Sequence, residues 1–314
     1  MDKMKNEKEF YFSNQDGSVK VTAISNFGIP GGDIEHFHEV SRDMQKYKWR
    51  DEDFLLATYP RNGTHVTWEV MSMLLNGSAE HIKKSKLYCN IEFCPLSKCD
   101  EWFPSPRVLN THYRLDVLPK EFHGRKTVLV LRNPKDVAVS YYNYMLTMTR
   151  LFTDGTEYVD DMVKMSLSEY IRHSFLTKDQ ALGNYFDYVE YMWSLRDDPN
   201  LLIIFYEDLV LETVKTVEKI DAFMGTNRSL ELIRQIAEAT SFEKMKDAKG
   251  GSMDELGQKI GIFRNAKKGA AVDVYRKGKV GDWKNCFTVA DNEFFESVLE
   301  KWPVYKDIPF KYQL

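Results

Sequence analysis

The first segment that could do chemistry is TYPRNGTH, residues 58–65, which lies between an apolar run and an expected helix. Backbone N–H groups at a glycine-containing turn before a helix hold anions well, and the helix dipole strengthens such a site. The segment lacks the second glycine–lysine pair of the Walker A loop, GxxxxGK[ST]. It therefore predicts an anion cradle at residues 61–64, with a plain strand-to-helix connection as the alternative.

A second candidate is VLRNPKDVAVSYY, residues 130–142. Arg132 directly follows an apolar run, and Ser140 lies two helical turns further along. The planar fork of an arginine binds phosphate through two hydrogen bonds, and a nearby hydroxyl adds another. The segment predicts a phosphate site; the alternative is that Arg132 pairs with Asp136 and that Ser140 is a small packing residue.

The third candidate is RKGKVGDWK, residues 276–284, where the cations Arg276 and Lys277 and two glycines suit phosphate binding. It ends a long stretch, residues 249–281, that contains seven glycines and many basic residues. This stretch predicts a mobile, lid-like loop over an anionic ligand. A solvated basic connector is the alternative.

The expected strands and helices, which must position these segments, alternate along the chain. Short apolar runs, of the kind found in sheets covered on both faces, predict strands at residues 54–58, 107–109, 127–131 and 201–205. A helix over residues 134–147 begins with Asn133 as its N-cap and Pro134 at its first position. Apolar stripes predict two more helices, one at Val214, Val217, Ile220 and Phe223 and one at Leu230, Ile233, Ile236 and Ala237. The pattern predicts one α/β domain over residues 1–314, with an N-terminal extension at residues 1–27 and a ligand site beyond the carboxyl ends of the strands.

Composition and charge limit the classes of function that the protein can have. Of the 314 residues, 43% are hydrophobic and 29% charged, as in an ordinary globular protein, and the net charge of −4 predicts no general attraction to nucleic acid or acidic membranes. The first residues contain no apolar signal-peptide core, and no run of about 18 apolar residues is present that could span a bilayer. Four cysteines, at spacings that fit no usual zinc site, predict reduced thiols, no metal and a cytoplasmic location.

Together, the motifs TYPxxGT, VLRNPKDVAVSYY and RKGxxGDWKNxFT resemble the cytosolic sulfotransferase family in both order and spacing. Further matches are RVLNTH at residues 107–112, FYED at 205–208 and TSF at 240–242, so the resemblance runs from residue 28 to the end. It implies a single α/β domain whose central, mostly parallel sheet is flanked by helices and carries a P-loop-like turn. It also implies that the protein uses 3′-phosphoadenosine 5′-phosphosulfate (PAPS), without a metal, and releases 3′-phosphoadenosine 5′-phosphate (PAP).

The resemblance implies roles for individual residues. Those implied in nucleotide binding are Arg61, Asn62, Gly63, Thr64, His65, Val66, Arg132, Ser140, Thr240, Ser241, Phe242, Arg276, Lys277 and Gly278. The first four would hold the 5′-phosphosulfate, with Arg61 as a catalytic cation. Arg132, Ser140 and residues 276–278 would grip the 3′-phosphate, and residues 240–242 would line the adenosine site. His112 matches the catalytic base, which takes a proton from the acceptor during in-line transfer.

The resemblance also implies an acceptor site and an oligomeric state. The residues that align with the family's acceptor site are Phe93, Asn110, Tyr144, Met148 and Phe186. They predict a small hydrophobic acceptor with a hydroxyl group (a phenol, steroid or other alcohol) or an amine, and plain core packing is the alternative. The segment Lys284–Glu293 fits the family's KxxxTVxxxE dimerisation pattern and predicts a homodimer, although such a segment is also compatible with ordinary surface.

The sequence departs from the family pattern inside the implied site. Arg61 stands where the family usually has a lysine, Asn62 where it has a serine, and Val66 where it has a tryptophan. Asn110 stands where a second lysine is common, and Phe186 where a tyrosine is. The 3′-phosphate grip is therefore expected to be intact and the sulfuryl end weaker. The alternative function is a catalytically weakened, donor-binding protein of the same fold; a P-loop kinase is disfavoured by the missing glycine–lysine pair.

Overall fold

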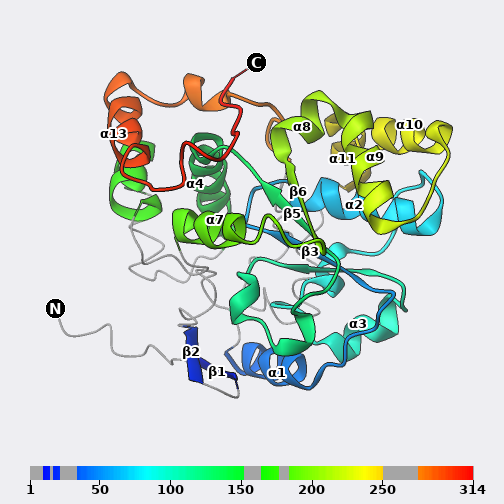
Figure 1. The fold of residues 1–314 in the computed structure, drawn as a ribbon. Coiled ribbons are helices and arrows are strands. Elements are labelled where there is room, and N and C mark those ends of the chain that lie inside the picture. Colours follow the sequence, from blue (N-terminus) through cyan, green and yellow to red (C-terminus); the bar gives the residue numbers. More distant parts are fainter. Residues whose placement is uncertain are drawn as a thin grey trace.

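Four parallel strands form the central sheet of the computed structural model, which describes the backbone of residues 10–14, 17–21, 34–151, 164–176, 184–249 and 275–313. Side chains are described from residue 39 to residue 147 and in the last three of these ranges. In spatial order, the strands are β4 (Val108–Thr111), β3 (Phe54–Thr58), β5 (Thr127–Leu131) and β6 (Leu201–Phe205), and Figure 1 labels the last three. Every neighbouring pair is parallel. The predicted α/β fold with a parallel sheet is confirmed, and only β4 departs from its expected range, residues 107–109.

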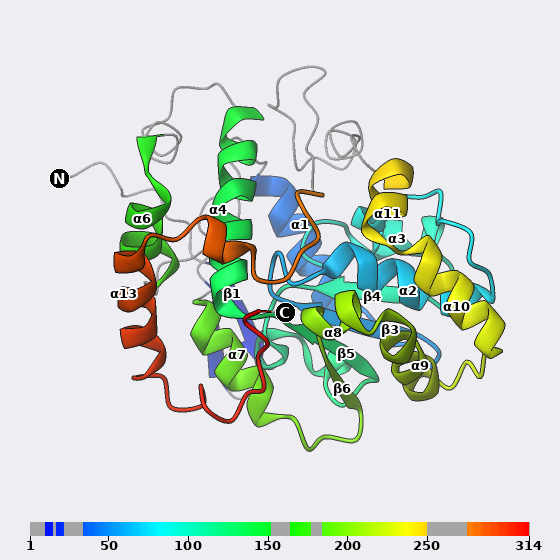
Figure 2. The same ribbon diagram turned by 90° about the horizontal axis from the view of Figure 1, so that it is seen from above.

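Helices cover both faces of this sheet (Figure 2). The α-helices are α1 (Ile34–Lys46), α2 (Thr64–Asn76), α3 (Leu96–Trp102), α4 (Pro134–Leu151), α6 (Leu167–Tyr170), α7 (Tyr185–Ser194), α8 (Tyr206–Leu211), α9 (Thr213–Met224), α10 (Leu230–Ala239), α11 (Phe242–Lys249) and α13 (Val289–Leu299). Shorter helical turns are η2 (Lys86–Cys89), η3 (Leu115–Val117), η4 (Lys120–Phe122), η5 (Ile171–Phe175) and η6 (Asp282–Asn285). Figure 2 shows α2, α9 and α10 on one side of the sheet and α4, α7 and α13 on the other.

The sheet is buried because each of its faces carries a separate layer of apolar side chains. In β5, Val128 and Val130 belong to the core that includes α2 and α9, whereas Leu129 and Leu131 belong to the core that includes α4, α7 and α13. Successive side chains of a strand point to opposite faces, so the unbroken apolar run of β5 serves both layers. Polar chemistry is therefore confined to the ends of the strands.

The helices begin and pack much as the sequence predicts. The backbone N–H of Asp136 donates to Oδ1 of Asn133 at 2.8 Å, which makes Asn133 the N-cap of α4. The apolar stripe of α10 faces the core through Ile233 and Ile236. Leu230, which was expected in that stripe, is 44% exposed. The prediction was wrong at this residue because Leu230 only opens the helix, and burial begins one turn later.

The parallel register brings the carboxyl ends of the strands to one edge of the sheet. Ala57 of β3 is paired with Thr111 of β4, and Leu131 of β5 is paired with Phe205 of β6. Residues that follow paired strand ends must lie near one another, and Arg132 is among them. This edge is where ligands bind in folds of this class.

Asp136 anchors the segment that carries the third basic motif. Its carboxylate accepts hydrogen bonds from the backbone N–H groups of Gly281 at 2.8 Å and Trp283 at 3.0 Å. Three residues before Gly281, Gly278 has a φ of +64°, and a Cβ at this position would lie 2.2 Å from the ring of Phe242. Glycine is therefore required both by the left-handed backbone and by the close contact. The basic motif is in this way fixed against α4 and α11.

The amino-terminal region contains an antiparallel pair, β1 (Phe10–Asn14) and β2 (Gly17–Val21), that the sequence analysis does not predict. The rest of the expected extension over residues 1–27 lies outside the described residues. Residues 250–274, most of the expected lid-like loop, also lie outside them. Within the described part of the chain, no helix combines the length and the apolar character needed to cross a membrane.

Replacing Gly278 with alanine should destabilise the protein more than the same change at Gly124. Both glycines have a left-handed backbone, with φ of +64° and +67°, but no atom lies within 4 Å of a Cβ built at Gly124. Both variants bear the cost of that backbone, about 1–2 kcal/mol. Gly278→Ala must also displace the ring of Phe242, at about 1–3 kcal/mol more. Thermal melting of the two variants side by side measures the difference, and equal losses would contradict the close contact.

Candidate active site

A pocket of about 380 Å³ lies at the carboxyl edge of the sheet. Its walls include residues that follow three different strands: Arg61 after β3, Arg132 after β5 and Tyr206 after β6. The expected nucleotide-binding residues that line it are Arg61, Gly63, Thr64, His65, Val66, Arg132, Ser140, Thr240, Ser241, Phe242, Arg276, Lys277 and Gly278. The structure thus brings segments from across the chain into one pocket, and Asn62 is the expected residue that does not line it.

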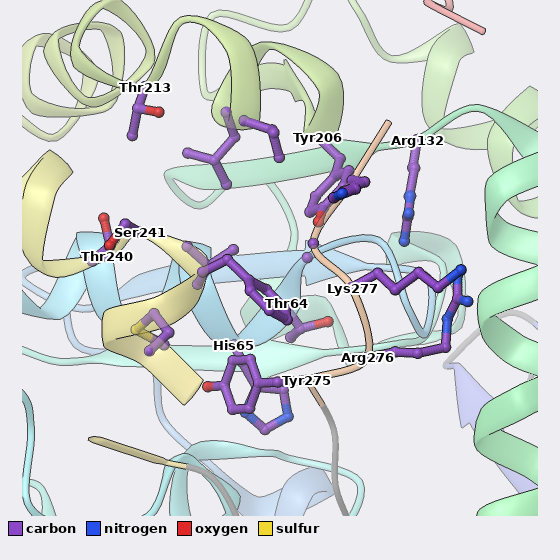
Figure 3. Close-up of a pocket in the computed structure, with 18 of the residues that line it drawn as sticks. Thr64, His65, Arg132, Tyr206, Thr213, Thr240, Ser241, Tyr275, Arg276 and Lys277 are labelled. Carbon is purple, nitrogen blue, oxygen red and sulfur yellow. The ribbon is translucent and has the colours of Figure 1, made fainter. Parts of the chain in front are cut away.

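The pocket has a basic side and a hydroxyl-bearing side. Figure 3 shows the side chains of Arg132, Arg276 and Lys277 together on one side. The hydroxyl groups of Thr240 and Ser241 lie across from them. A ligand that carries an anionic group at one end and polar, uncharged groups at the other fits this distribution.

The turn after β3 presents the start of α2 to the pocket. Arg61 and Gly63 both have left-handed backbone, with φ of +72° and +97°. A Cβ at Gly63 would lie 2.6 Å from the ring of Tyr206, so glycine is needed for the turn to approach the end of β6. The N–H groups in the first turn of a helix have no partner within the helix. Those of residues 64–66 are therefore the groups that an anion in this pocket would meet.

Arg132 is held at the end of β5 by the neighbouring turn. Its Nη1 donates to the backbone oxygen of Arg61 at 2.8 Å, and its guanidinium carbon lies 4.2 Å from the ring centre of Tyr206. Its Nη2 is 4.0 Å from the carboxylate of Asp136, too long for a direct hydrogen bond. The alternative, an ion pair with Asp136, is thus present as a long contact without a direct hydrogen bond. The guanidinium is oriented by main chain and ring contacts.

Arg61 lies beside Ser140, on the same side of the pocket as Arg132. Its Nε donates to Oγ of Ser140 at 3.1 Å, and its guanidinium carbon lies 5.0 Å from the ring centre of Tyr144. Burial, with a contribution from the charge of Arg132, lowers the pKa of Arg61 to about 10, so the group stays charged at neutral pH. The resemblance implies a cation at the sulfuryl end, but in this structure the side chain is directed to the Ser140 side.

Arg276 and Lys277 are both held by Asp282. Nη2 of Arg276 and Nζ of Lys277 lie 2.6 and 2.8 Å from its two carboxylate oxygens. Although burial acts in the opposite direction, hydrogen bonds from Lys277 and Arg276 hold the pKa of Asp282 below its usual value. The carboxylate is thus ionised and keeps both cations at the pocket, where a phosphate would compete with it for them.

Asn62 and Trp68 face the protein interior. Nδ2 of Asn62 donates to the backbone oxygen of Val130 at 3.1 Å, which ties the turn to β5. Nε1 of Trp68 donates to the backbone oxygen of Val108 at 2.9 Å. The side chain of Asn62 therefore has a structural role, and the contact of this residue with a nucleotide stays a prediction. Val66 lines the pocket where the family has a tryptophan, and Trp68 does not take that place.

His112 follows β4 and is oriented by the end of β3. Its Nδ1 lies 2.8 Å from the backbone oxygen of Thr58. Because a carbonyl oxygen only accepts hydrogen bonds, Nδ1 carries the hydrogen and Nε2 keeps its lone pair. Burial, and secondly the charge of Lys86, lower the pKa of His112 to about 3, so the ring is neutral at physiological pH. Oγ1 of Thr58 is also 2.8 Å from Oγ1 of Thr64, which lines the pocket.

The expected acceptor residues Phe93 and Tyr144 lie near these groups. The ring centres of Phe93 and His112 are 6.5 Å apart, and Tyr144 lies beneath the guanidinium of Arg61. Asn110 is completely buried, and its Oδ1 accepts a hydrogen bond from Nζ of Lys86 at 2.7 Å. Its side chain is thus part of the wall behind the site.

Phe186 belongs to the core, and the side chain of Met148 lies outside the described residues. The ring centre of Phe186 is 4.8 Å from that of Trp302 and 6.2 Å from that of Phe295. Core packing, the alternative for Phe186, therefore describes its position.

The sequence analysis missed several pocket residues, most of them apolar or aromatic. They are Tyr206, Leu209, Val210, Thr213, Ala237, Glu243, Met245 and Tyr275. One signal was available, because Tyr206 directly follows a predicted strand as Arg132 does. The helical residues carry no such local signal. In the described ranges, no group of three or more histidine, cysteine or acidic side chains is arranged to hold a metal ion.

The sequence as a whole matches known sulfotransferases. The sulfotransferase domain family matches residues 51–307. Mouse sulfotransferase 1A1 is 30% identical over 299 residues, which cover 91% of this chain and 96% of the mouse protein. Rat sulfotransferase 1C2 is 30% identical over 294 residues, with coverage of 90% and 92%. Among solved structures, that of mouse sulfotransferase SULT7A1 complexed with PAP has a TM-score of 0.61 and 25% identity, and the match covers 95% of this chain and 98% of that one. With its motifs, fold and pocket all in agreement, this chain belongs to the sulfotransferase family.

Proposed function

We propose that this sulfotransferase moves the sulfuryl group of PAPS to a hydroxyl or amine group of a small hydrophobic acceptor. The observation that carries the proposal is the single pocket in which the first turn of α2, Arg132 and residues 276–278 meet. Two separate anion-binding regions suit a nucleotide with a phosphate group at each of two positions. The PAP complex of mouse SULT7A1 supports the same class of ligand here.

Each part of the pocket suits one part of this nucleotide. The N–H groups of residues 64–66 would hold the 5′-phosphosulfate at the start of α2. Arg132 and Ser140, with residues 276–278, would hold the 3′-phosphate through a charged fork, a hydroxyl and nearby backbone. Residues 240–242, which line the same pocket, would contact the adenosine.

The residues of the chain supply a base for the transfer. When bound, PAPS offers a sulfur atom whose bond to the bridging oxygen of the 5′-phosphate breaks as the acceptor forms its own bond to sulfur. The electron pair of the broken bond stays on the phosphate, and Nε2 of His112 takes the proton of the acceptor. An imidazole with a pKa of about 3 is a weak base. Anionic groups bound nearby would raise that pKa because they favour the imidazolium.

The acceptor class rests on aromatic side chains near the base. Phe93 lies beside His112, and Tyr144 lies beside Arg61. Such rings suit a phenol, a steroid, another alcohol or an aromatic amine. The cytoplasmic location stays a prediction.

We also propose that the protein forms a homodimer through the segment Lys284–Glu293. All positions that fit the dimerisation pattern are exposed: Lys284, Thr288, Val289 and Glu293. Val289 is 76% exposed at the start of α13. Thr288 and Asp291 form a reciprocal capping box, which gives the segment a defined shape. A two-fold partner would cover the exposed valine.

Replacing Arg132 with methionine should weaken the binding of PAP far more than that of AMP. The arginine would contact the 3′-phosphate, which AMP lacks, and a charge-assisted hydrogen bond contributes about 1.5–3 kcal/mol, or about 10- to 100-fold in affinity. Isothermal titration calorimetry with both nucleotides measures the effect. The matched control is Arg234→Met, at an exposed position of α10. Equal losses for PAP and AMP would contradict the role of Arg132.

Replacing His112 with alanine should lower kcat at least about 100-fold while the dissociation constant for PAP stays within about threefold, because the residue acts on the acceptor proton. Transfer of radiolabelled sulfate from PAPS to a panel of hydroxyl and amine compounds provides the measurement. The control is His123→Ala, whose Nε2 is bonded to the backbone oxygen of Leu118 away from the pocket. Full activity in His112→Ala would show that His112 is not the base. Donor binding by the wild-type protein without turnover on any acceptor would favour the alternative function.

Replacing Val289 with glutamate should convert the dimer to a monomer, as measured by light scattering coupled to size-exclusion chromatography. The matched control is Leu230→Glu, since Leu230 is also exposed and also follows a helix N-cap, Ser229. An acidic residue in the first helical turn is favourable in both variants, so both should fold. A wild-type monomer, or an equal shift in the control, would contradict the proposed interface.

A further inference from the structure

Lys86 places a buried ammonium group beside the candidate base. The residue begins the short helical turn η2, and it is only 7% exposed. Its Nζ donates to Oδ1 of Asn110 at 2.7 Å, and Asn110 lies on β4, two residues before His112. Neither the motifs of the sequence nor the proposed function gives Lys86 a role.

The segment that carries Lys86 is fixed along β4. Asn90 forms an isolated parallel bridge with Asn110, and the backbone N–H of Ile91 donates to the backbone oxygen of Asn110 at 3.0 Å. Oε1 of Glu92 accepts the backbone N–H of His112 at 2.7 Å. The positions of Lys86 and His112 are therefore coupled through well-defined contacts.

The charge of Lys86 acts on the side chains that face the reacting region. After burial itself, it is the largest cause of the lowered pKa of His112 and of His65, which lines the pocket. Burial lowers the pKa of Lys86 to about 8, so most of the group is still protonated at pH 7. Its charge thus disfavours the protonated form of both histidines.

A buried ammonium is costly for folding because burial penalises its charge. The neutral amide of Asn110 and the charge of Glu92 offset that penalty only in part, since the pKa of Lys86 is still lowered. Such a group is typical of functional sites. Two features of this chain leave the region around His112 without the cations that the family pattern implies. Asn110 stands where a second lysine is common, and the guanidinium of Arg61 is directed to Ser140.

We propose that Lys86 is a catalytic residue whose ammonium contacts the sulfuryl oxygens of the bound donor and supplies the positive charge that Asn110 lacks. This inference rests on the proposed function. During transfer, sulfur exchanges its bond to the bridging oxygen for a bond to the acceptor, and the acceptor proton goes to His112. Lys86 keeps its own proton and stabilises the negative charge that is shared among sulfuryl, bridging and phosphate oxygens.

The decisive test compares PAPS with PAP, which lacks the sulfuryl group. Lys86→Met should weaken PAPS binding about tenfold and leave PAP binding within about twofold, since only PAPS has oxygens that reach Lys86. Calorimetry with each nucleotide, at 4 °C and without acceptor, gives both constants. The variant is expected to fold, because Oδ1 of Asn110 still accepts from Nδ2 of Asn90 at 3.2 Å. The control is Lys83→Met, at an exposed position of the same segment.

A second variant distinguishes an effect of the charge of Lys86 from a structural role of this residue. Adding Asn110→Lys to Lys86→Met restores a lysine at the family's usual position, and it should recover PAPS affinity to within about threefold of wild type and raise kcat at least about tenfold over Lys86→Met. A structural role for Lys86 would not be rescued in this way.

The outcomes distinguish this proposal from the function on which it rests. If the wild-type protein binds both nucleotides, but Lys86→Met changes both constants equally or neither, the role of Lys86 is overturned and the proposed function stands. Failure of the rescue overturns it as well. If the wild-type protein binds neither PAPS nor PAP, the proposed function fails and the role of Lys86 fails with it.

Discussion

The hydrogen bond from Nη1 of Arg132 to the backbone oxygen of Arg61 joins the end of β5 to the turn after β3. It helps to hold Arg61 in a left-handed conformation that costs a non-glycine residue about 1–2 kcal/mol. In this shape the turn brings Gly63 against the ring of Tyr206 and starts α2 with its N–H groups at the pocket. The same side chain therefore forms the basic side of the pocket and shapes the turn on its other side. The two anion-binding regions are coupled through one guanidinium.

The site gathers positive charge where burial disfavours it. Burial lowers the pKa of Arg61 to about 10 and that of Lys86 to about 8. An anionic ligand would offset this penalty, so the electrostatics of the site favour a polyanion. Arg276 and Lys277 differ from Arg61 and Lys86 because each forms an ion pair with Asp282, which holds both in place. Preordered side chains lose less conformational entropy when a ligand binds.

The sequence predicted the parts of the site that depend on short-range rules. Arg132 and the turn at residues 61–64 were found because they follow apolar strands, and parallel strands end at one edge. The direction of a long side chain was not predictable in the same way. Arg61 turns to Ser140 because a hydroxyl and the ring of Tyr144, both on α4, offer it contacts.

Contacts between distant segments were also beyond the sequence. Lys86 contacts Asn110, which lies 24 positions later in the chain. One lysine among several basic residues carries no local sequence signal of such a contact. Phe186 was assigned to the acceptor by alignment, whereas its packing against Trp302 depends on where the segment after α13 lies. The pair β1 and β2 was missed because each strand is only five residues long and the aromatic run that opens β1 does not alternate.

The central claim is that one pocket holds a nucleotide by two separate anionic groups, one at main-chain amides and one at arginine. A crystal structure of the protein with PAP tests this most directly. We predict the 5′-phosphate within hydrogen-bonding distance, about 3 Å, of the N–H groups of residues 64–66, and the 3′-phosphate at the same distance from Arg132 and Ser140. A nucleotide bound in the reverse orientation, or outside this pocket, would contradict the account.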